Sequence, residues 1–452
     1  MPGGSLAAVR HASRTTRRIT ARPRLLSAIA ATALAVGTAA GCGGTERDRA
    51  APSGPSKRVV AIVQDDAELL HRSPQRIAAT LDDLRGLGVD WVRVTAGWSV
   101  IAPDPTADRR PAGFDAADPG AYPDGAWDAL DRLQRLTRRR GLRIAIDIAF
   151  WAPRWAVARP NADREQRNER SGIDPGEFAA FAQAVARRYP DAAAFTIWNE
   201  PNHTAFLLPQ WQQDPAGNWT AASPQNYRDM LRASVPKVKA AAPDAVVLIG
   251  ATSSLGTAQG TDARERMSPL TFARRLACVD DALRPDPRQP GCAGFTPLPG
   301  DGWSHHPYAV DVPPSARDPR PETVRLGDLD RLTTLLHALH AAGRTTTDLP
   351  VYLTEFGYQT SPPDPTQEVS LADQAAWVAE AEQVARSHPE VRATAQFLVR
   401  DLPERPGDDL RTRWRDYQSG LRFEDGRPKP AYLTYAVALA IARAQEAIAA
   451  AP

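Results

Sequence analysis

The sequence predicts one α/β domain, a (β/α)8 TIM barrel with long strand-to-helix loops. From Arg58 onward, short apolar segments typical of strands alternate with amphipathic segments typical of helices. There are eight strand candidates, which cover 59–63, 91–95, 143–150, 194–198, 245–250, 302–306, 350–356 and 393–399. This number and this alternation are those of a closed parallel barrel.

Helical patterns lie between the strand candidates. Ser73-Pro74 combines a capping serine with a proline suited to the first helical position. After the second strand candidate, Trp127, Leu130, Leu133 and Leu136 recur at three-residue steps and form one apolar face. Six further helices are expected at 177–188, 226–241, 270–277, 329–342, 371–386 and 432–449.

The connections between these elements are unequal in length. Helix-to-strand connections such as 140–142 and 242–244 are short, whereas strand-to-helix connections such as 99–123 and 400–430 are long and rich in proline, charge and aromatic residues. In a (β/α)8 barrel all strand-to-helix loops emerge on one face, so we expect them to wall a cleft there. An open doubly wound sheet is the alternative, but no glycine-rich phosphate loop follows the first strand.

Composition and charge are those of an ordinary globular protein. Of 452 residues, 42% are hydrophobic and 24% are charged. Six of the 55 basic residues are arginines within the first 24 positions, and the rest of the chain is mildly acidic, with 49 basic against 53 acidic residues. A mildly acidic body without a basic stripe argues against nucleic acid as the main partner.

Residues 1–42 are predicted to be an export signal. A basic region ends at Arg24, and the uncharged stretch 25–40 that follows is short for a membrane span. Small residues before Cys42 resemble a bacterial lipobox, in which the cysteine is acylated and anchors the protein to the membrane. Because Ala39 stands where leucine is usual, cleavage with release is the alternative. We therefore expect an extracellular protein or a cell-surface lipoprotein, with 43–57 as a polar tether and 58–452 as the barrel.

Two cysteines, Cys278 and Cys292, remain in the body of the chain. In an oxidising compartment they would close a loop of about 15 residues, worth about 3 kcal/mol in the chain-entropy model. Two unrelated buried thiols are the alternative. We expect the disulfide, since it would tie down an otherwise unstructured loop.

Two glutamates stand at the ends of strand candidates. Glu200 ends the fourth and is followed by Pro201, which stops the strand, and Glu355 ends the seventh. Because side chains alternate along a strand, we expect both carboxylates to face inward at the mouth of a small barrel. Either glutamate alone would be no more than a solvated strand end. A converging pair is what glycoside hydrolysis needs, and a separation of about 5–5.5 Å selects the retaining route.

The string Trp198-Asn199-Glu200-Pro201-Asn202 resembles the family 39 xylosidase-type glycoside hydrolases and their family 5 relatives, which belong to clan A. The resemblance extends over about 58–449. It implies a barrel in which Glu200 is the general acid/base and Glu355 the nucleophile of a retaining mechanism. It also implies that Asn199 hydrogen-bonds the 2-hydroxyl of the reacting sugar.

Further positions match the clan. Arg93 stands in an apolar run where the clan has an arginine beside the nucleophile, and its charge would lower the pKa of Glu355. His306-Pro307-Tyr308 matches a His-x-Tyr pattern whose tyrosine hydroxyl donates to the nucleophile. The alternatives are a surface arginine and a buried histidine beside a turn. Glu200 is expected to begin the reaction protonated and then to activate water.

Aromatic residues are the remaining signal for sugar binding. Seven tryptophans lie at strand ends or in long loops, namely Trp98, Trp151, Trp155, Trp211, Trp219, Trp303 and Trp414. Trp151 and Trp303 are the main candidates for substrate contact, with Trp155 beside them. The clan often places a tryptophan at the end of strand eight, where this chain has Phe397-Leu398-Val399 instead.

No cofactor or metal is expected. A metal site at His305-His306 lacks a third ligand at a suitable spacing in the sequence. The sequence thus predicts a monomeric, exported, retaining glycoside hydrolase that cleaves a β-linked oligo- or polysaccharide, with no nucleic-acid partner. Loop lengths favour attack within a sugar chain. The alternatives are a cell-surface carbohydrate-binding protein that has lost turnover and a transglycosylase with the same two glutamates. A peptidase or esterase is disfavoured, because no nucleophile-elbow or triad pattern is present.

Overall fold

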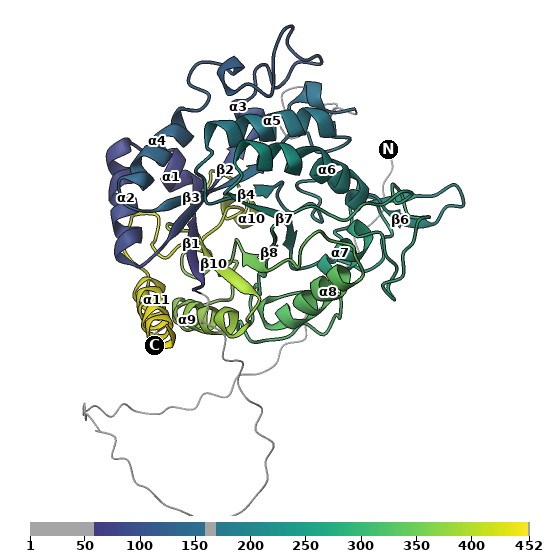
Figure 1. The fold of residues 1–452 in the computed structure, drawn as a ribbon. Helices are drawn as coiled ribbons and strands as arrows, with labels where there is room; N and C mark the ends of the chain where they lie inside the picture. The colour runs from purple at the N-terminus through teal and green to yellow at the C-terminus, as the bar shows by residue number, and fades with distance from the viewer. Residues whose placement is uncertain (1–57, 159–168, 451–452) are drawn as a thin grey trace, which may run out of the picture. The chain divides into compact units, whose positions relative to one another are not determined.

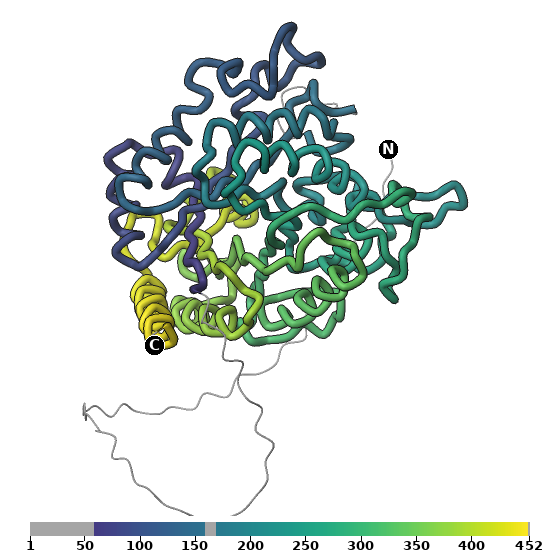
Figure 2. The backbone as a smooth tube through the Cα atoms, viewed as in Figure 1, coloured from purple at the N-terminus to yellow at the C-terminus, as the bar shows by residue number. Residues whose placement is uncertain are grey.

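The computed structural model describes residues 58–158 and 169–450 and contains the predicted (β/α)8 barrel (Figure 1). The barrel strands are parallel and close in the order β1-β10-β9-β8-β7-β4-β3-β2. They are β1 (Val60–Gln64), β2 (Trp91–Gly97), β3 (Arg143–Ala149), β4 (Ala194–Ile197), β7 (Val246–Ser253), β8 (Gly302–His306), β9 (Val351–Leu353) and β10 (Val391–Phe397). β1 pairs with β10, so the first and last strands of the chain complete the closure (Figure 2). All eight strand predictions are confirmed, with ends shifted by at most three residues.

The long helices surround the barrel. They are α2 (Pro74–Gly86), α4 (Asp128–Arg138), α5 (Pro175–Arg188), α6 (Ser223–Ala241), α7 (Pro269–Leu276), α8 (Leu329–Ala341), α9 (Leu371–Ser387) and α11 (Pro430–Ala449). As predicted, Ser73 caps α2: its hydroxyl accepts a hydrogen bond from the N–H of Arg76, and Pro74 takes the first helical position. In the part of the chain that the structure describes, no helix combines the length and the apolarity needed to cross a bilayer.

The long loops contain short elements that the sequence did not indicate. These are the helices α1 (Asp66–Leu70), α3 (Trp98–Ile101) and α10 (Leu410–Arg413), three single 3-10 turns, and a hairpin of β5 (Trp211–Gln213) and β6 (Trp219–Ala221). Each is too short to carry a readable period, so the sequence pattern gave no sign of it.

The strands separate two layers of core. Ile62, Trp91, Ala145, Leu248 and Tyr352 point into the barrel, whereas their chain neighbours pack under the surrounding helices. Because residues two apart on a strand share a face, these residues also identify the inward-facing positions nearer the carboxyl ends of the strands. They are occupied by polar residues, namely Gln64, Arg93, Asp147 and His306. The interior of the barrel is therefore apolar at its base and polar at the mouth.

A buried ion pair fixes the loop that follows β10. Nζ of Lys429 lies 2.8 Å from Oδ1 of Asp401, and both side chains are at most 1% exposed. The same ammonium donates to the hydroxyl of Thr360 and to the carbonyl of Gln418. The N–H of Gly420 donates to Asp401 as well. This network holds the far end of the loop against the barrel.

Cys278 and Cys292 form the predicted disulfide, with their Cα atoms 5.6 Å apart, and close part of the connection between α7 and β8. The predicted export signal (1–42), the tether (43–57) and the lipidation candidate Cys42 lie outside the described residues.

Candidate active site

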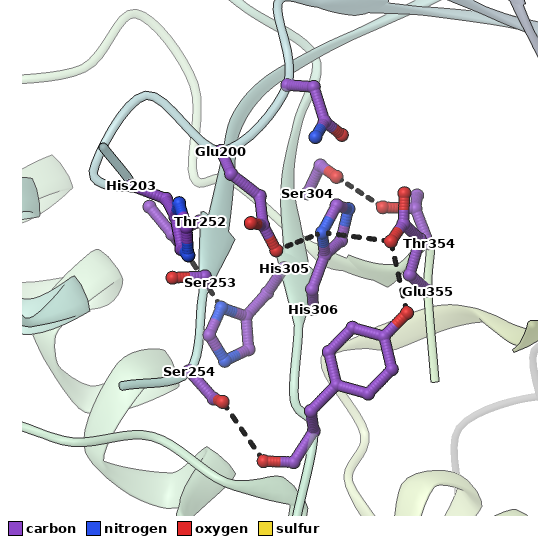
Figure 3. A network of polar contacts seen from close by, with 12 residues as sticks. Glu200, His203, Thr252, Ser253, Ser254, Ser304, His305, His306, Thr354 and Glu355 are labelled. Atoms are coloured by element: carbon purple, nitrogen blue, oxygen red, sulfur yellow. Dashed lines mark hydrogen bonds and ion pairs between the residues drawn. The ribbon is translucent and has the colours of Figure 1, made fainter. Parts of the chain in front are cut away.

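Glu200 and Glu355 come together at the carboxyl ends of the barrel strands. One carboxylate oxygen of each, and one ring nitrogen of His306, all lie within 4.8 Å of one another. Figure 3 shows the imidazole of His306 between the two carboxylates. Only 8% of Glu200 and 9% of Glu355 is exposed. The predicted convergence of the two side chains at the barrel mouth is present.

An irregular backbone places Glu200. β4 ends at Ile197, and both Trp198 (φ 63°) and Glu200 (φ 37°) then adopt the left-handed conformation that non-glycine residues rarely enter. The N–H of Glu200 donates to the carbonyl of Ala251, and the buried side chain of Asn202 ties the same turn to the loop after β7. Strain of this kind persists only where the surroundings enforce it, and it often marks a functional position.

Glu355 also lies beyond its strand. Tyr352 and Thr354 face the barrel interior, where the hydroxyl of Thr354 hydrogen-bonds that of Ser304 at 2.6 Å. Strict alternation would therefore turn Glu355 outward. β9 ends at Leu353, however, and the irregular chain that follows brings the carboxylate back to the mouth of the barrel. The inward direction was predicted correctly, but strand alternation is not its cause.

Donors surround both oxygens of Glu355. Nη1 of Arg93 donates to Oε1 at 2.7 Å, the hydroxyl of Tyr308 donates to Oε2 at 3.1 Å, and Nδ1 of His306 lies 3.5 Å from Oε2. Burial by itself would raise the pKa of Glu355, but the charges of His306 and Arg93 and the two hydrogen bonds outweigh it, so the pKa is lowered. Burial beside this anion raises the pKa of Tyr308 well above its ordinary value, so its hydroxyl stays a donor.

Arg93 is the centre of a buried polar network. It is 1% exposed, and its guanidinium also contacts Oε1 of Gln64, Oδ2 of Asp147 at 3.2 Å and Oδ1 of Asn199 at 3.5 Å. Burial raises the pKa of Asp147 to about 7, although the charge of Arg93 acts in the opposite direction. Sequence reasoning identified Arg93 and Asn199 but missed Gln64 and Asp147. Register was the available signal, because Gln64 pairs with Arg93 and Asp147 occupies an inward position on the next strand.

The two adjacent histidines point to opposite sides of β8. Nδ1 of His306 lies 2.9 Å from Oε1 of Glu200, inside the site. His305 faces the helices, where its Nδ1 accepts from the hydroxyl of Thr252 and its Nε2 donates to the carbonyl of Val324. Burial lowers the pKa of His305 to about 3, so this ring is neutral. Strand alternation thus leaves His306 alone in the site.

The atoms of Glu200, His306 and Glu355 are spaced closely enough to hold a metal ion, a grouping that the sequence spacing did not reveal. The donor set favours another use. Both oxygens of Glu355 already accept hydrogen bonds, one from the cation Arg93 and one from Tyr308. A carboxylate held in this way is stabilised as an anion by the protein itself.

The tryptophans contribute less than expected. Trp303 is 1% exposed, and its ring packs over Gly250, where a Cβ would lie 2.5 Å from it. Trp303 and His306 are three residues apart on β8, so their side chains point to opposite faces of the strand. Because His306 faces into the site, Trp303 faces away from it, and the expected contact of Trp303 with substrate is wrong. Trp151 is half-buried, and its indole N–H donates to the carbonyl of Ala205. The remaining candidates are buried (Trp98, Trp211) or half-buried (Trp155, Trp219, Trp414).

A cavity of about 300 Å³ opens beside Glu200. Besides the predicted residues Glu200 and Tyr308, its lining includes His203, Arg266, Gln359, Gln367 and Tyr417, which sequence reasoning missed. Tyr417 is 48% exposed, and its ring meets that of Phe397 edge to face at 5.2 Å. Burial and the charges of the two glutamates raise its pKa to about 12. This ring lies beside the end of β10, where the expected strand-eight tryptophan is missing.

No family model matches this sequence, and neither does any curated protein. Similar folds occur among solved structures. A family 39 glycoside hydrolase from the gut symbiont Bacteroides cellulosilyticus WH2 has a TM-score of 0.54 and 18% identity, over 86% of this chain and 64% of that one. GH5_18 from Streptomyces cattleya in complex with GlcNAc has a TM-score of 0.53 and 18% identity, over 86% of this chain and 81% of that one. A GH5_18 from Bifidobacterium longum subsp. infantis has a TM-score of 0.50 and 16% identity, over 85% and 79%.

This chain thus spans less than two thirds of the length of the family 39 enzyme. At these identities the likeness concerns the fold. The resemblance to family 39 and family 5 enzymes is confirmed at that level: this chain has the barrel fold of the family 39 and GH5_18 glycoside hydrolases of clan A.

Proposed function

We propose that this protein is a retaining glycoside hydrolase that cleaves β-linked oligo- or polysaccharides. The observation that carries the proposal is the pair of buried glutamates at the barrel mouth, one of them bound by Arg93 and Tyr308. The fold shared with family 39 and GH5_18 enzymes supports it. The Streptomyces cattleya GH5_18 structures hold GlcNAc or Manb1-4GlcNAc, which is in keeping with a β-linked substrate.

The different surroundings of the two glutamates support different roles for them. Glu355 accepts from a guanidinium and a phenol and has a lowered pKa, so it is the anionic nucleophile. Glu200 contacts His306 and lines the open cavity, so it is the residue that can reach the leaving oxygen. Environments that differ in this way are how paired carboxylates divide acid and base work.

The reaction then runs in two displacements. An oxygen of Glu355 attacks the anomeric carbon while Glu200 gives its proton to the glycosidic oxygen, so that the leaving sugar departs as an alcohol and a glycosyl ester forms on Glu355. Glu200, now a carboxylate, takes a proton from a water molecule, and that water attacks the same carbon. The ester bond to Glu355 breaks, Glu200 is reprotonated, and the product keeps the original anomeric configuration.

Other residues position the reactants. Asn199, which Arg93 contacts, is proposed to bind the sugar 2-hydroxyl, and Tyr417 is proposed to pack against a sugar face. We also propose that the protein acts as a monomer outside the cell, after cleavage of residues 1–42 or anchored through Cys42. No metal or cofactor takes part in this mechanism.

The test uses the purified protein with a panel of aryl β-glycosides and β-linked polysaccharides. Glu355→Ala and Glu200→Ala should each lower turnover by roughly 10³-fold or more, whereas the exposed control Glu424→Ala should not. Azide should restore activity to Glu355→Ala by attack on the vacated face, giving the glycosyl azide of inverted configuration. Proton NMR of the wild-type product should show retention.

Four outcomes would contradict the proposal. Activity like that of the wild type in either glutamate variant rejects the assignment, and an inverted product rejects the retaining route. Sugar binding without turnover, unaltered in Glu355→Ala, supports the carbohydrate-binding alternative. Transfer to sugar acceptors in place of water, measured at high acceptor concentration, would identify a transglycosylase.

A further inference from the structure

Unpaired arginines gather on the Glu200 side of the cavity. Arg266 is exposed and lines the cavity together with Glu200 and His203. Arg264 lies on the same loop, and Arg170 lies on the loop after β3. Among residues 58–158 and 169–450, no hydrogen bond or ion pair engages the guanidinium of Arg170, Arg264 or Arg266. None of the three guanidinium groups is therefore held in a direct ion pair within that part of the protein.

Backbone contacts fix both loops beside the turn that carries Glu200. The N–H of Met267 donates to the carbonyl of Asn202, and the carbonyl of Arg266 accepts from the N–H of Thr257 at 2.8 Å. On the other side, the carbonyl of Arg170 accepts from the N–H of Leu208 at 2.8 Å. Arg266 and Arg170 thus flank the segment 201–208 from two directions.

The imidazole of His203 is near enough to Arg266 and Arg170 for their charges to act on it. Burial lowers the pKa of His203. The charge of Glu200 raises it, but the charges of Arg266 and Arg170 act together with burial, so the pKa is lowered overall. Its Nδ1 accepts from the N–H of Ala205 at 2.9 Å, so the neutral ring carries its proton on Nε2 and offers a donor. Figure 3 shows His203 beside Glu200. Charged and neutral donors therefore surround the same region.

Among the described residues, the acids that neighbour these arginines along the chain are already engaged. Oδ1 of Asp262 accepts from the backbone N–H of Arg264, and the carboxylate of Glu265 accepts from Thr261. Glu169 is paired with Arg154. Burial and the charge of Arg264 lower the pKa of Arg170, and the charge of Glu169 offsets them only in part. A region of positive potential is left at the cavity mouth.

We propose that Arg266 and Arg170, with Arg264 at the rim and His203 as a neutral donor, bind an anionic group on the leaving part of the substrate. This rests on the proposed function, since it is the role of Glu200 as proton donor that makes this the leaving side. A guanidinium matches the planar or tetrahedral oxygens of a carboxylate or a sulfate ester with paired N–H donors. The substrate class is therefore an acidic β-linked glycan, with a uronic acid or a sulfated sugar next to the scissile bond.

Matched oligosaccharides test this proposal. Substrates with the same reacting sugar and linkage would carry, on the leaving side, a neutral hexose, a uronic acid or a 6-O-sulfated hexose. We expect kcat/KM to be about 10- to 100-fold higher for an acidic member than for the neutral one, and the two acidic arms distinguish carboxylate from sulfate. The preference should shrink as sodium chloride rises, because salt screens exposed charges.

Arginine variants locate the preference. In Arg266→Ala combined with Arg170→Ala the ratio between acidic and neutral substrates should fall to within about 2-fold. In Arg266→Glu it should fall below 1. The control Arg85→Ala removes an exposed arginine on the opposite face of the barrel and should leave both the ratio and the rates unchanged. Unchanged thermal unfolding would confirm that the variants fold.

A binding experiment distinguishes failure of this inference from failure of the proposed function. Calorimetric titration of Glu355→Gln with the same oligosaccharides should give tighter binding of an acidic member than of the neutral one. This difference in affinity should be lost when Arg266→Ala and Arg170→Ala are added. If the wild type hydrolyses no glycoside, this titration still decides whether the arginines select anions. Equal affinity for acidic and neutral members, or a preference that survives removal of both arginines, would overturn the proposal.

Discussion

The guanidinium of Arg93 and the carboxylate of Glu355 form a buried ion pair, with Nη1 2.7 Å from Oε1. Glu200, less than 5 Å away from the same carboxylate, contacts a histidine instead. Two chemically identical side chains at one barrel mouth therefore experience different electrostatic surroundings. That asymmetry, together with the hydrogen bond from Tyr308, has consequences that can be measured.

The first concerns the acid limb of the pH profile. In the proposed mechanism Glu355 attacks as an anion, so activity should be lost as pH falls through its pKa, which is lowered from the ordinary glutamate value. Tyr308→Phe removes a donor to this anion, so the pKa should rise and the acid limb of kcat/KM should move to higher pH. Tyr122→Phe, which removes a buried hydroxyl bonded to the carbonyl of Ala116, is the matched control. An acid limb unmoved in Tyr308→Phe would contradict the role of that hydrogen bond.

The second concerns stability and Asp147. Burial raises the pKa of this carboxyl to about 7, above its value in the unfolded chain, so the folded state favours the protonated form. The stabilisation linked to this proton is complete below about pH 4. As pH rises from about 4 to about 7, the free energy of unfolding falls by about 1.4 kcal/mol for each pH unit, and above about 7 the contribution is lost. Asp147→Asn should remove this pH dependence. The free energy of unfolding of Asp147→Asn and of the wild type would be measured in urea at pH 4.5 and 7.5. Relative to the wild type, the variant should be more stable at pH 7.5 than at pH 4.5. A difference that is the same at both pH values would contradict the raised pKa.

The third concerns Tyr417, whose half-exposed ring borders the cavity and meets Phe397. If a sugar packs on this ring, Tyr417→Ala should raise KM by about 10-fold, because an aromatic contact of this size is worth about 1 kcal/mol or more. Tyr417→Phe keeps the ring and should stay near the wild type. Steady-state kinetics on the best substrate of the panel would measure both. Equal KM values for the alanine variant and the wild type would exclude the contact.

The fold was predictable because its signals are local and repeated. Strand periodicity and unequal connections recur around the barrel, and each strand confirms the pattern of the others. The convergence of Glu200, Glu355, Arg93 and Tyr308 was predicted from the strand ends and from resemblance to a known clan. Regular alternation does not produce it, because the chain is irregular after β4 and after β9. Strand register would also have found Asp147, and it would have excluded Trp303 once His306 was placed inside, since one strand cannot direct both inward.

The cavity lining was less predictable. Tyr417, His203 and Arg266 lie in loops without a period, and their positions depend on contacts far apart in sequence. Tyr417 lies in a loop whose ends are held together by Lys429 and Asp401, 28 residues apart. No pattern in 400–430 distinguishes Tyr417 from Trp414, because neither propensity nor spacing encodes which ring a long loop will deliver to a site.

The buried pair of Lys429 and Asp401 supplies the last prediction. Lys429→Met would leave Asp401 buried without its cation, and breaking such a pair costs about 3–5 kcal/mol in free energy of unfolding. Burial raises the pKa of Asp401 to about 6 even though the charge of Lys429 lowers it. Without Lys429, Asp401 should therefore take up a proton more readily, and the loss of stability should be larger at pH 8 than at pH 5. Adding Asp401→Leu should recover part of the stability, because no uncompensated charge then remains.

Lys237→Met, at a half-buried position on α6, is the control and should change stability little. Urea unfolding of the four proteins measures each step, and a loss below about 1 kcal/mol in Lys429→Met would show that the loop carrying Tyr417 is held by other contacts.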